Sequence, residues 1–206
     1  MEVALLTVGD ELLSGDTENT NASWLGRQLA DAGATVTRVL TVPDDESGIA
    51  DAVARYHEAF DAVIVTGGIG GTPDDVTKAG VADAFDRDLV VPDDVRAHLE
   101  AKAEQFAAGC IVEDVNVFPG IPAELKAMYA TVADAFDGDR TTETIYTPAP
   151  EGALVGAVTA ARERFDVAVG SYPRRDDAPG RVKVTGDDPD AVADAAAWLR
   201  DRTETV

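Results

Sequence analysis

Four glycines in five positions make the segment from Thr66 to Asp75 (TGGIGGTPDD) the part of the chain best suited to ligand chemistry. These glycines are Gly67, Gly68, Gly70 and Gly71. Glycine lets the backbone take positive φ and come close to a ligand. Thr72 is expected to cap the next helix, with Pro73 in its first turn. The free N–H groups and the positive end of the helix dipole would then hold a phosphate or carboxylate without a lysine.

Two acidic pairs accompany this segment, and each has two interpretations. Asp74 and Asp75 either stabilise the helix start, by about 0.3–1 kcal/mol each through the dipole, or carry a divalent cation. Such a cation, commonly Mg²⁺, would cancel the repulsion between the carboxylates and a bound phosphate. Asp10 and Glu11, which follow the first predicted strand, belong either to a solvated turn or to the same ligand site. Spacing leaves both alternatives open.

Three loops follow predicted strands and are expected at one edge of a sheet. They cover residues 9–16, 66–75 and 119–122. In open parallel sheets, ligands bind outside the carboxyl ends of the strands, where the strand order reverses. Pro119 and Gly120 in the last loop are therefore candidate ligand contacts, although this loop alone is also consistent with a stiff connector.

Strands and helices that alternate along the chain must position these loops. Apolar runs and alternation predict strands at 2–8, 34–42, 62–65 and 115–118, and helical stripes predict helices at 20–32, 46–60, 73–85, 92–108 and 122–136. The pattern is typical of an α/β fold with a doubly wound, mainly parallel sheet.

The alternation of single strands with helices changes near Asp137. The remaining chain predicts a strand at 142–147, a helix at 151–165, strands at 167–172 and 181–185, and a helix at 189–202. The last two strands must form a hairpin, because parallel neighbours would need a crossover connection. We therefore predict two domains, 1–138 and 139–206, of which the second is a small α+β (βαββα) unit.

The charge balance is strongly acidic. The 206 residues include 39 acids and 17 Lys or Arg, which gives a net charge of −22. This surface disfavours nucleic acid as a partner, because nucleic-acid binding depends on basic side chains that neutralise phosphates. It resembles the surface of proteins from salt-loving organisms.

Other features of the sequence indicate the cellular location of the protein. No apolar run approaches the roughly 20 residues that a membrane-spanning helix needs, and we expect no membrane partner. The start of the chain lacks the pattern of a signal peptide. Cys110 is the only cysteine, which excludes an internal disulfide. We expect a cytoplasmic protein.

The loops taken together resemble the molybdopterin-binding (MogA/MoaB-like) domain, and more closely the amino-terminal domain of the competence/damage-inducible CinA family. The matching stretches are Gly9–Gly15 (GDELLSG), Asn19–Asn21 (NTN), Thr66–Thr77 (TGGIGGTPDDVT) and Phe118–Met128 (FPGIPAELKAM). Gly170–Pro173 (GSYP) resembles the start of the hairpin in that family's second domain. The chain departs from the CinA pattern at Gly71, where proline is usual, and is shorter between Gly109 and Phe118.

The resemblance implies a small-molecule ligand, either molybdopterin-like or a nucleotide diphosphate, at the glycine-rich loop. The implied ligand contacts are Gly67, Gly68, Gly70, Gly71, Thr72, Asp74, Pro119 and Gly120. In the molybdopterin branch, the Asp matching Asp75 is important for adenylylating the pterin. In the CinA branch, the domain is associated with divalent-metal-dependent hydrolysis of ADP-ribose-type pyrophosphates.

The hydrolase interpretation makes Asp75 the catalytic residue and makes Asp10 and Asp75 ligands of a divalent metal, expected to be Mg²⁺. The alternative is a non-catalytic molybdopterin binder, or a participant in molybdenum cofactor biosynthesis. A homo-oligomer is left open.

Overall fold

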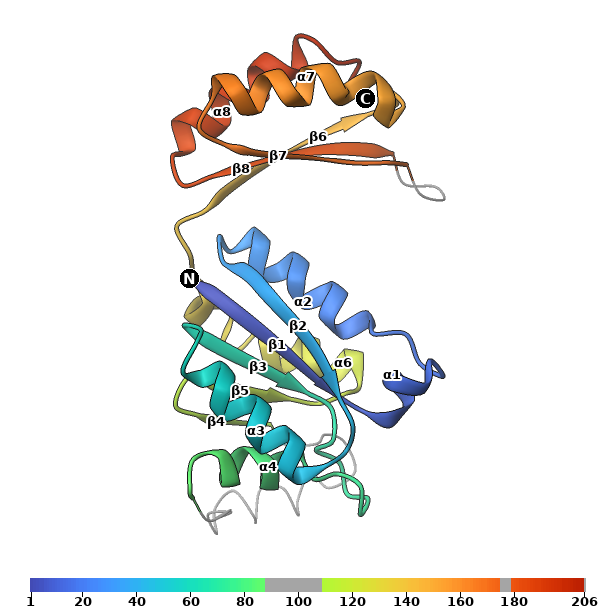
Figure 1. The fold of residues 1–206 in the computed structure, drawn as a ribbon, viewed down its shortest axis with the longest axis vertical. Helices are drawn as coiled ribbons and strands as arrows, with labels where there is room; N and C mark the ends of the chain where they lie inside the picture. Colours follow the sequence, from blue (N-terminus) through green and yellow to red (C-terminus); the bar gives the residue numbers. More distant parts are fainter. Residues whose placement is uncertain (88–108, 175–178, 206) are drawn as a thin grey trace. The chain divides into compact units, whose positions relative to one another are not determined.

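The computed structural model describes residues 1–87, 109–174 and 179–205. The chain divides into two compact units (Figure 1). The first contains Met1–Leu29 and Ala34–Asp137, and the second contains Ala30–Gly33 and Gly138–Val206. In the described part of the chain, no helix is long and apolar enough to cross a membrane.

The first unit is built on a five-stranded sheet. Its strands are β1 (Glu2–Val8), β2 (Thr35–Val42), β3 (Ala62–Thr66), β4 (Cys110–Val112) and β5 (Val115–Phe118). They lie in the order β2-β1-β3-β5-β4, and every neighbouring pair is parallel except the antiparallel β4–β5 pair. The prediction of a doubly wound, mainly parallel α/β sheet is confirmed.

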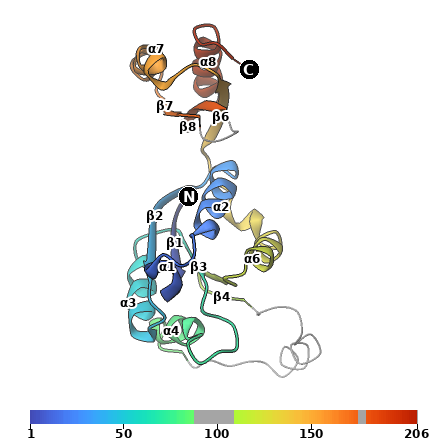
Figure 2. The ribbon, with the colours of Figure 1, turned by 90° about the vertical axis from the view of Figure 1, so that its right-hand side faces the viewer.

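Helices cover both faces of this sheet (Figure 2). The helices in the described part of the unit are α1 (Asp10–Ser14), α2 (Thr20–Asp31), α3 (Glu46–His57), α4 (Thr77–Ala84) and α6 (Pro122–Tyr129), with a short 3₁₀ helix, η1 (Ala133–Phe136). Alternate residues of β1 point to opposite faces. Leu6 packs in the cluster that includes Ile49 of α3 and Val81 of α4. Leu5 packs in the other cluster, with residues of α2 and α6.

The second unit has the predicted βαββα order. Its elements are β6 (Thr141–Thr147), α7 (Glu151–Arg164), β7 (Ala168–Tyr172), β8 (Gly180–Gly186) and α8 (Pro189–Arg200). The strands are antiparallel in the order β6-β8-β7, which confirms the predicted hairpin between β7 and β8. Both helices lie on one face of this sheet (Figure 1), where residues such as Val182 and Val184 pack against Leu199 of α8.

Several local predictions differ from the structure. The helix predicted at 73–85 begins only at Thr77, and the helix predicted at 122–136 ends at Tyr129 before η1. The three-residue strand β4 and the five-residue helix α1 were not predicted. The helix predicted at 92–108 lies outside the described residues.

Candidate functional site

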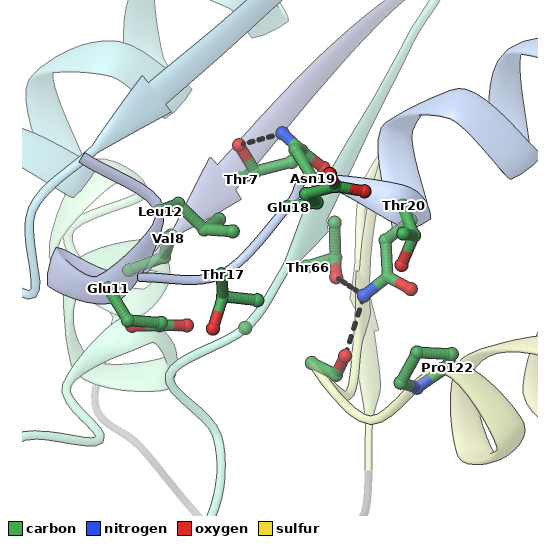
Figure 3. Close-up of a pocket in the computed structure, with 13 residues that line it drawn as sticks. Thr7, Val8, Glu11, Leu12, Thr17, Glu18, Asn19, Thr20, Thr66 and Pro122 are labelled. Carbon is green, nitrogen blue, oxygen red and sulfur yellow. Dashed lines mark hydrogen bonds between the residues drawn. The ribbon is translucent and has the colours of Figure 1, made fainter. Parts of the chain in front are cut away.

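The three predicted loops meet at the carboxyl ends of β1, β3 and β5. The parallel registers place Thr7 beside Thr66 and Thr66 beside Phe118. A small pocket of about 90 Å³ opens here (Figure 3). Its lining consists of Thr7, Val8, Glu11, Leu12, Thr17, Glu18, Asn19, Thr20, Asn21, Thr66, Gly67, Gly120 and Pro122. Ligand pockets commonly measure about 300–1,000 Å³, so this one has room for only part of a pterin or nucleotide.

The amide of Asn21 connects the loops. Its Nδ2 donates to the Gly120 carbonyl at 2.6 Å and to Thr66 Oγ1 at 3.3 Å (Figure 3). Thr66 Oγ1 in turn donates to the Pro119 carbonyl at 3.2 Å. The start of α2 is therefore fixed to the end of β3 and to the predicted contacts Pro119 and Gly120.

A second amide, that of Asn19, orients the start of α2. Its Oδ1 accepts from the backbone N–H of Ala22 at 3.0 Å, as a helix cap does. Its Nδ2 donates to Thr7 Oγ1 at 3.0 Å (Figure 3). The sequence interpretation assigned no role to Asn19, Asn21, Thr7 or Thr66. An Asn directly before a helical stripe is a cap signal that would have marked Asn19.

Gly67 and Gly68 adopt the positive φ expected for them, at 103° and 60°. A Cβ on Gly67 would lie 2.1 Å from the Val8 carbonyl oxygen, so the loop crosses the end of β1 at backbone contact distance. A Cβ on Gly68 would lie 2.3 Å from Thr77 Oγ1. Only glycine fits these two positions, because each has both a left-handed backbone and a close neighbour.

The prediction of a positive φ is wrong at the other two glycines of the loop. Gly70 and Gly71 are absent from the residues with positive φ. A Cβ on Gly70 would meet the Asp75 carboxylate at 2.7 Å, whereas one on Gly71 would meet nothing within 4 Å. The Asp75 side chain therefore leaves little room for a larger residue at position 70. At position 71, neither a neighbouring atom nor the backbone conformation requires glycine.

Thr72 does not cap a helix. Its backbone N–H and its Oγ1 both donate to Asp75 Oδ2, at 2.8 and 2.7 Å, and its carbonyl accepts from the Asp75 N–H at 3.0 Å. These bonds close a turn over residues 72–75 that competes with helix formation. Helix α4 begins after this turn, so the predicted cap by Thr72 and the predicted first helical turn at Pro73 are wrong.

Asp75 is held as a carboxylate. Its partial burial would raise its pKa, but the hydrogen bonds from Thr72 and from the Gly70 backbone, together with the charge of Lys78, outweigh burial and lower the pKa. Lys78 also donates from Nζ to the Ile69 carbonyl at 3.4 Å. This lysine, not singled out in the sequence, brings a positive charge to the loop.

Asp44 lies beside the acids of the first loop, and the sequence did not identify it as a candidate site residue. Its Oδ2 accepts from the Asp10 backbone N–H at 3.0 Å. Burial raises the pKa of Asp44, and the negative charges of Asp10, Glu11 and Asp74 raise it further, against the lowering effect of that hydrogen bond. Three carboxylates thus act on Asp44 beside the glycine loop, and a bound cation would offset their negative charge.

Comparisons with known proteins place the chain in a family. The sequence profile described as "probable molybdopterin binding domain" matches residues 4–137, more than half of the chain. The chain belongs to that family. Residues 140–205 match the profile described as "FAD synthase, middle domain".

Individual relatives agree with this assignment. A protein of Archaeoglobus fulgidus is 35% identical over 95% of both chains. A CinA-like protein of Citrifermentans bemidjiense is 48% identical over 52% of this chain, but that match spans only 26% of the relative. The solved structure of a protein CinA of unknown function from Thermoplasma acidophilum has a TM-score of 0.61 and 30% identity, covering 66% of this chain and 97% of that one. The resemblance to the CinA family is confirmed.

Proposed function

We propose that the first unit binds a molybdopterin-like or nucleotide diphosphate ligand at the Gly67–Asp75 loop and hydrolyses an ADP-ribose-type pyrophosphate with a divalent metal. The observation that carries the proposal is the meeting of this loop with the Gly9–Gly15 and Pro119–Pro122 loops at one edge of the sheet. Gly67 and Gly68 bring the backbone close to the β1 end, and the Asn21 amide holds the Gly120 carbonyl in place.

The side chains at this edge suit a hard cation. Asp10, Asp44 and Asp75 offer carboxylate oxygens, the donors that Mg²⁺ prefers. Among the described residues, no group of three or more His, Cys, Asp or Glu is arranged to hold a metal ion. Mg²⁺ usually uses one or two carboxylates together with substrate phosphates. In the proposal, Asp10 and Asp75 hold the ion and the ligand phosphates complete its shell.

Each residue then has a defined task. The bound metal would neutralise phosphate charge in the transition state. The bonds from Thr72 keep Asp75 ionised and fix its direction. Asn21 and Thr66 fix the carbonyl groups of Gly120 and Pro119 in the third loop. The Lys78 ammonium, near Asp75, supplies the positive charge that an anionic ligand needs in an acidic protein.

A binder without hydrolysis is the second candidate. It would serve as a non-catalytic molybdopterin binder or take part in molybdenum cofactor biosynthesis. The neutral hydroxyl and amide groups of Thr7, Asn19, Asn21 and Thr66 in the pocket wall favour it, because such groups recognise a ligand but do not activate water strongly.

The test compares Asp75→Asn with the wild-type chain. Asparagine keeps an oxygen for the two bonds from Thr72 and removes only the charge. Thermal-shift measurements with ADP-ribose, FAD, AMP and molybdopterin, with and without Mg²⁺, identify the ligand. We expect Asp75→Asn to lower Mg²⁺-dependent turnover of the ligand by about 100-fold or more. Asp83→Asn, an exposed acid of α4, is the matched control. Equal turnover in wild type and Asp75→Asn would leave the binding candidate.

We also propose a cellular location and an assembly state for the protein. The −22 charge supports work in a salt-rich cytoplasm. Self-association into a homo-oligomer is a prediction that sedimentation in high salt would test.

A further inference from the structure

The second sheet presents a basic, aromatic face on the side opposite α7 and α8. Its register pairs Tyr146 of β6 with Arg181 of β8, and Arg181 with Tyr172 of β7. The next row on that face consists of Thr144, Lys183 and Gly170. Side chains alternate along a strand, so these six residues share one face. Their neighbours Ile145, Val182 and Val169 are buried on the other face.

The chemistry of these six residues contrasts with the rest of the chain. Tyr146 and Tyr172 are 50% and 45% exposed, whereas the other two tyrosines of the chain are buried. The Arg181 guanidinium lies 5.3 Å from the centre of the Tyr172 ring. None of the six is acidic, although the chain has 39 acids. The tyrosines and basic residues together form a surface that attracts planar, anionic groups.

Strand geometry sets the spacing of these groups. Tyr146 and Tyr172 stand on strands that flank β8, so their Cα positions are about 10 Å apart. Arg181 and Lys183 are two residues apart on β8, a separation of about 7 Å. A Cβ on Gly170 would lie 3.2 Å from the Tyr172 ring, so this ring covers Gly170. Two aromatic platforms therefore flank a central pair of cations.

We propose that this face binds a dinucleotide, with one base on Tyr146, the other on Tyr172, and the diphosphate on Arg181 and Lys183. Bases stack on aromatic side chains without sequence preference, and Arg adds a planar cation to such a surface. A dinucleotide uses both tyrosines, whereas a mononucleotide uses one. Its charge is small, so the −22 chain repels it far less than it repels a polynucleotide. This site belongs to the second unit and is independent of the ligand proposed for the first.

FAD is the probe for the test, because flavin fluorescence reports its binding to the full chain. We expect Tyr172→Leu to weaken FAD binding by about 5- to 150-fold, the range found when a stacking side chain is removed. We expect Arg181→Gln, which removes a charged donor to the diphosphate, to weaken it by about 10- to 150-fold. Arg162→Gln on the exposed surface of α7 is the matched control and should bind FAD as the wild type does. FMN and AMP, which carry one base each, should bind more weakly than FAD.

Three results would overturn the proposal. They are FAD binding whose affinity and number of bound FAD molecules are unchanged by both Tyr172→Leu and Arg181→Gln, the absence of saturable FAD binding, and tighter binding of single-stranded oligoadenylate than of FAD. Circular dichroism of each variant checks that the second unit is folded. Since Tyr172 and Arg181 are changed separately, misfolding of one variant leaves the other to decide.

Discussion

Replacing Gly67 by alanine tests the proposed crossing of the glycine loop over β1. Gly67 has a φ of 103°, which L-residues rarely adopt, and its added Cβ would lie 2.1 Å from the Val8 carbonyl oxygen. Real Cβ atoms essentially never come closer than 3.0 Å to such an atom, so the loop or the end of β1 must move by about 1 Å. The movement would displace the first and second loops of the candidate site relative to each other.

Two costs contribute to the expected loss of stability. A non-glycine residue in this backbone conformation costs about 1–3 kcal/mol, and the forced shift of packed backbone costs about 1–3 kcal/mol more. The free energy of unfolding of the first unit should therefore fall by roughly 2–6 kcal/mol, a large part of the 5–15 kcal/mol typical of a domain. Ligand binding at the loop should weaken in the same variant.

Urea denaturation in high KCl measures this loss, because the two tryptophans report on different units. Trp24 packs against Tyr129 in the first unit, at 5.4 Å between ring centres. Trp198 lies in the second unit, and its Nε1 has no hydrogen-bond partner among the described residues. Trp198→Phe therefore removes no hydrogen bond of that nitrogen and leaves Trp24 as the reporter of the first unit. Gly71→Ala is the control, because its Cβ meets nothing within 4 Å. If Gly67→Ala unfolds within 0.5 kcal/mol of Gly71→Ala, a span of about the ordinary surface effect, the crossing argument is wrong.

Other outcomes follow from charge, hydrogen bonds and the division into units. The melting temperature should rise as KCl rises from about 0.1 M, since the Debye length falls from about 10 Å to about 3 Å at 1 M; a constant value would contradict this use of the −22 charge. The raised pKa of Asp44 means that the folded state loses stability as pH rises through that pKa. Asp44→Asn should therefore raise the melting temperature at pH near 7 and not in acid, and a fall at neutral pH would count against it. Asn21→Leu removes both bonds of that amide and should cost about 1–3 kcal/mol in Trp24-monitored unfolding; an unchanged midpoint would show that the Gly120 carbonyl needs no such donor. A chain ending after Arg140 should unfold cooperatively by calorimetry, and loss of its transition would mean that both units share one core.

Strand and helix periodicity predicted most of the architecture, because buried strands such as β1 and β3 are short apolar runs between turn signals. The start of α4 was wrong for a local reason. Pro73 and two acids fit a first helical turn, but Asp75 instead accepts two bonds from Thr72. Helix propensities of single residues do not include the competing hydrogen bonds between Thr72 and Asp75.

The site was predictable where the backbone dictates residue type and unpredictable where distant side chains meet. Gly67 and Gly68 are required by conformation. The bonds of Asn21 to Thr66 and Gly120 join residues 45 and 99 positions apart, and a sequence alone does not show such pairs. Asp44 was missed for the same reason, since it meets Asp10 across 34 positions.

The strand order β2-β1-β3-β5-β4 has a consequence for how the chain emerges from the ribosome. β3 is complete at Thr66, but its partner β5 ends only at Phe118. At about 5–20 residues per second, the open edge of β3 waits roughly 3–10 s for that partner. A strand such as β3, whose first four residues are apolar, is a site for aggregation while its edge is unpaired. The surplus of negative charge would then protect the nascent chain by keeping neighbouring copies apart during this interval.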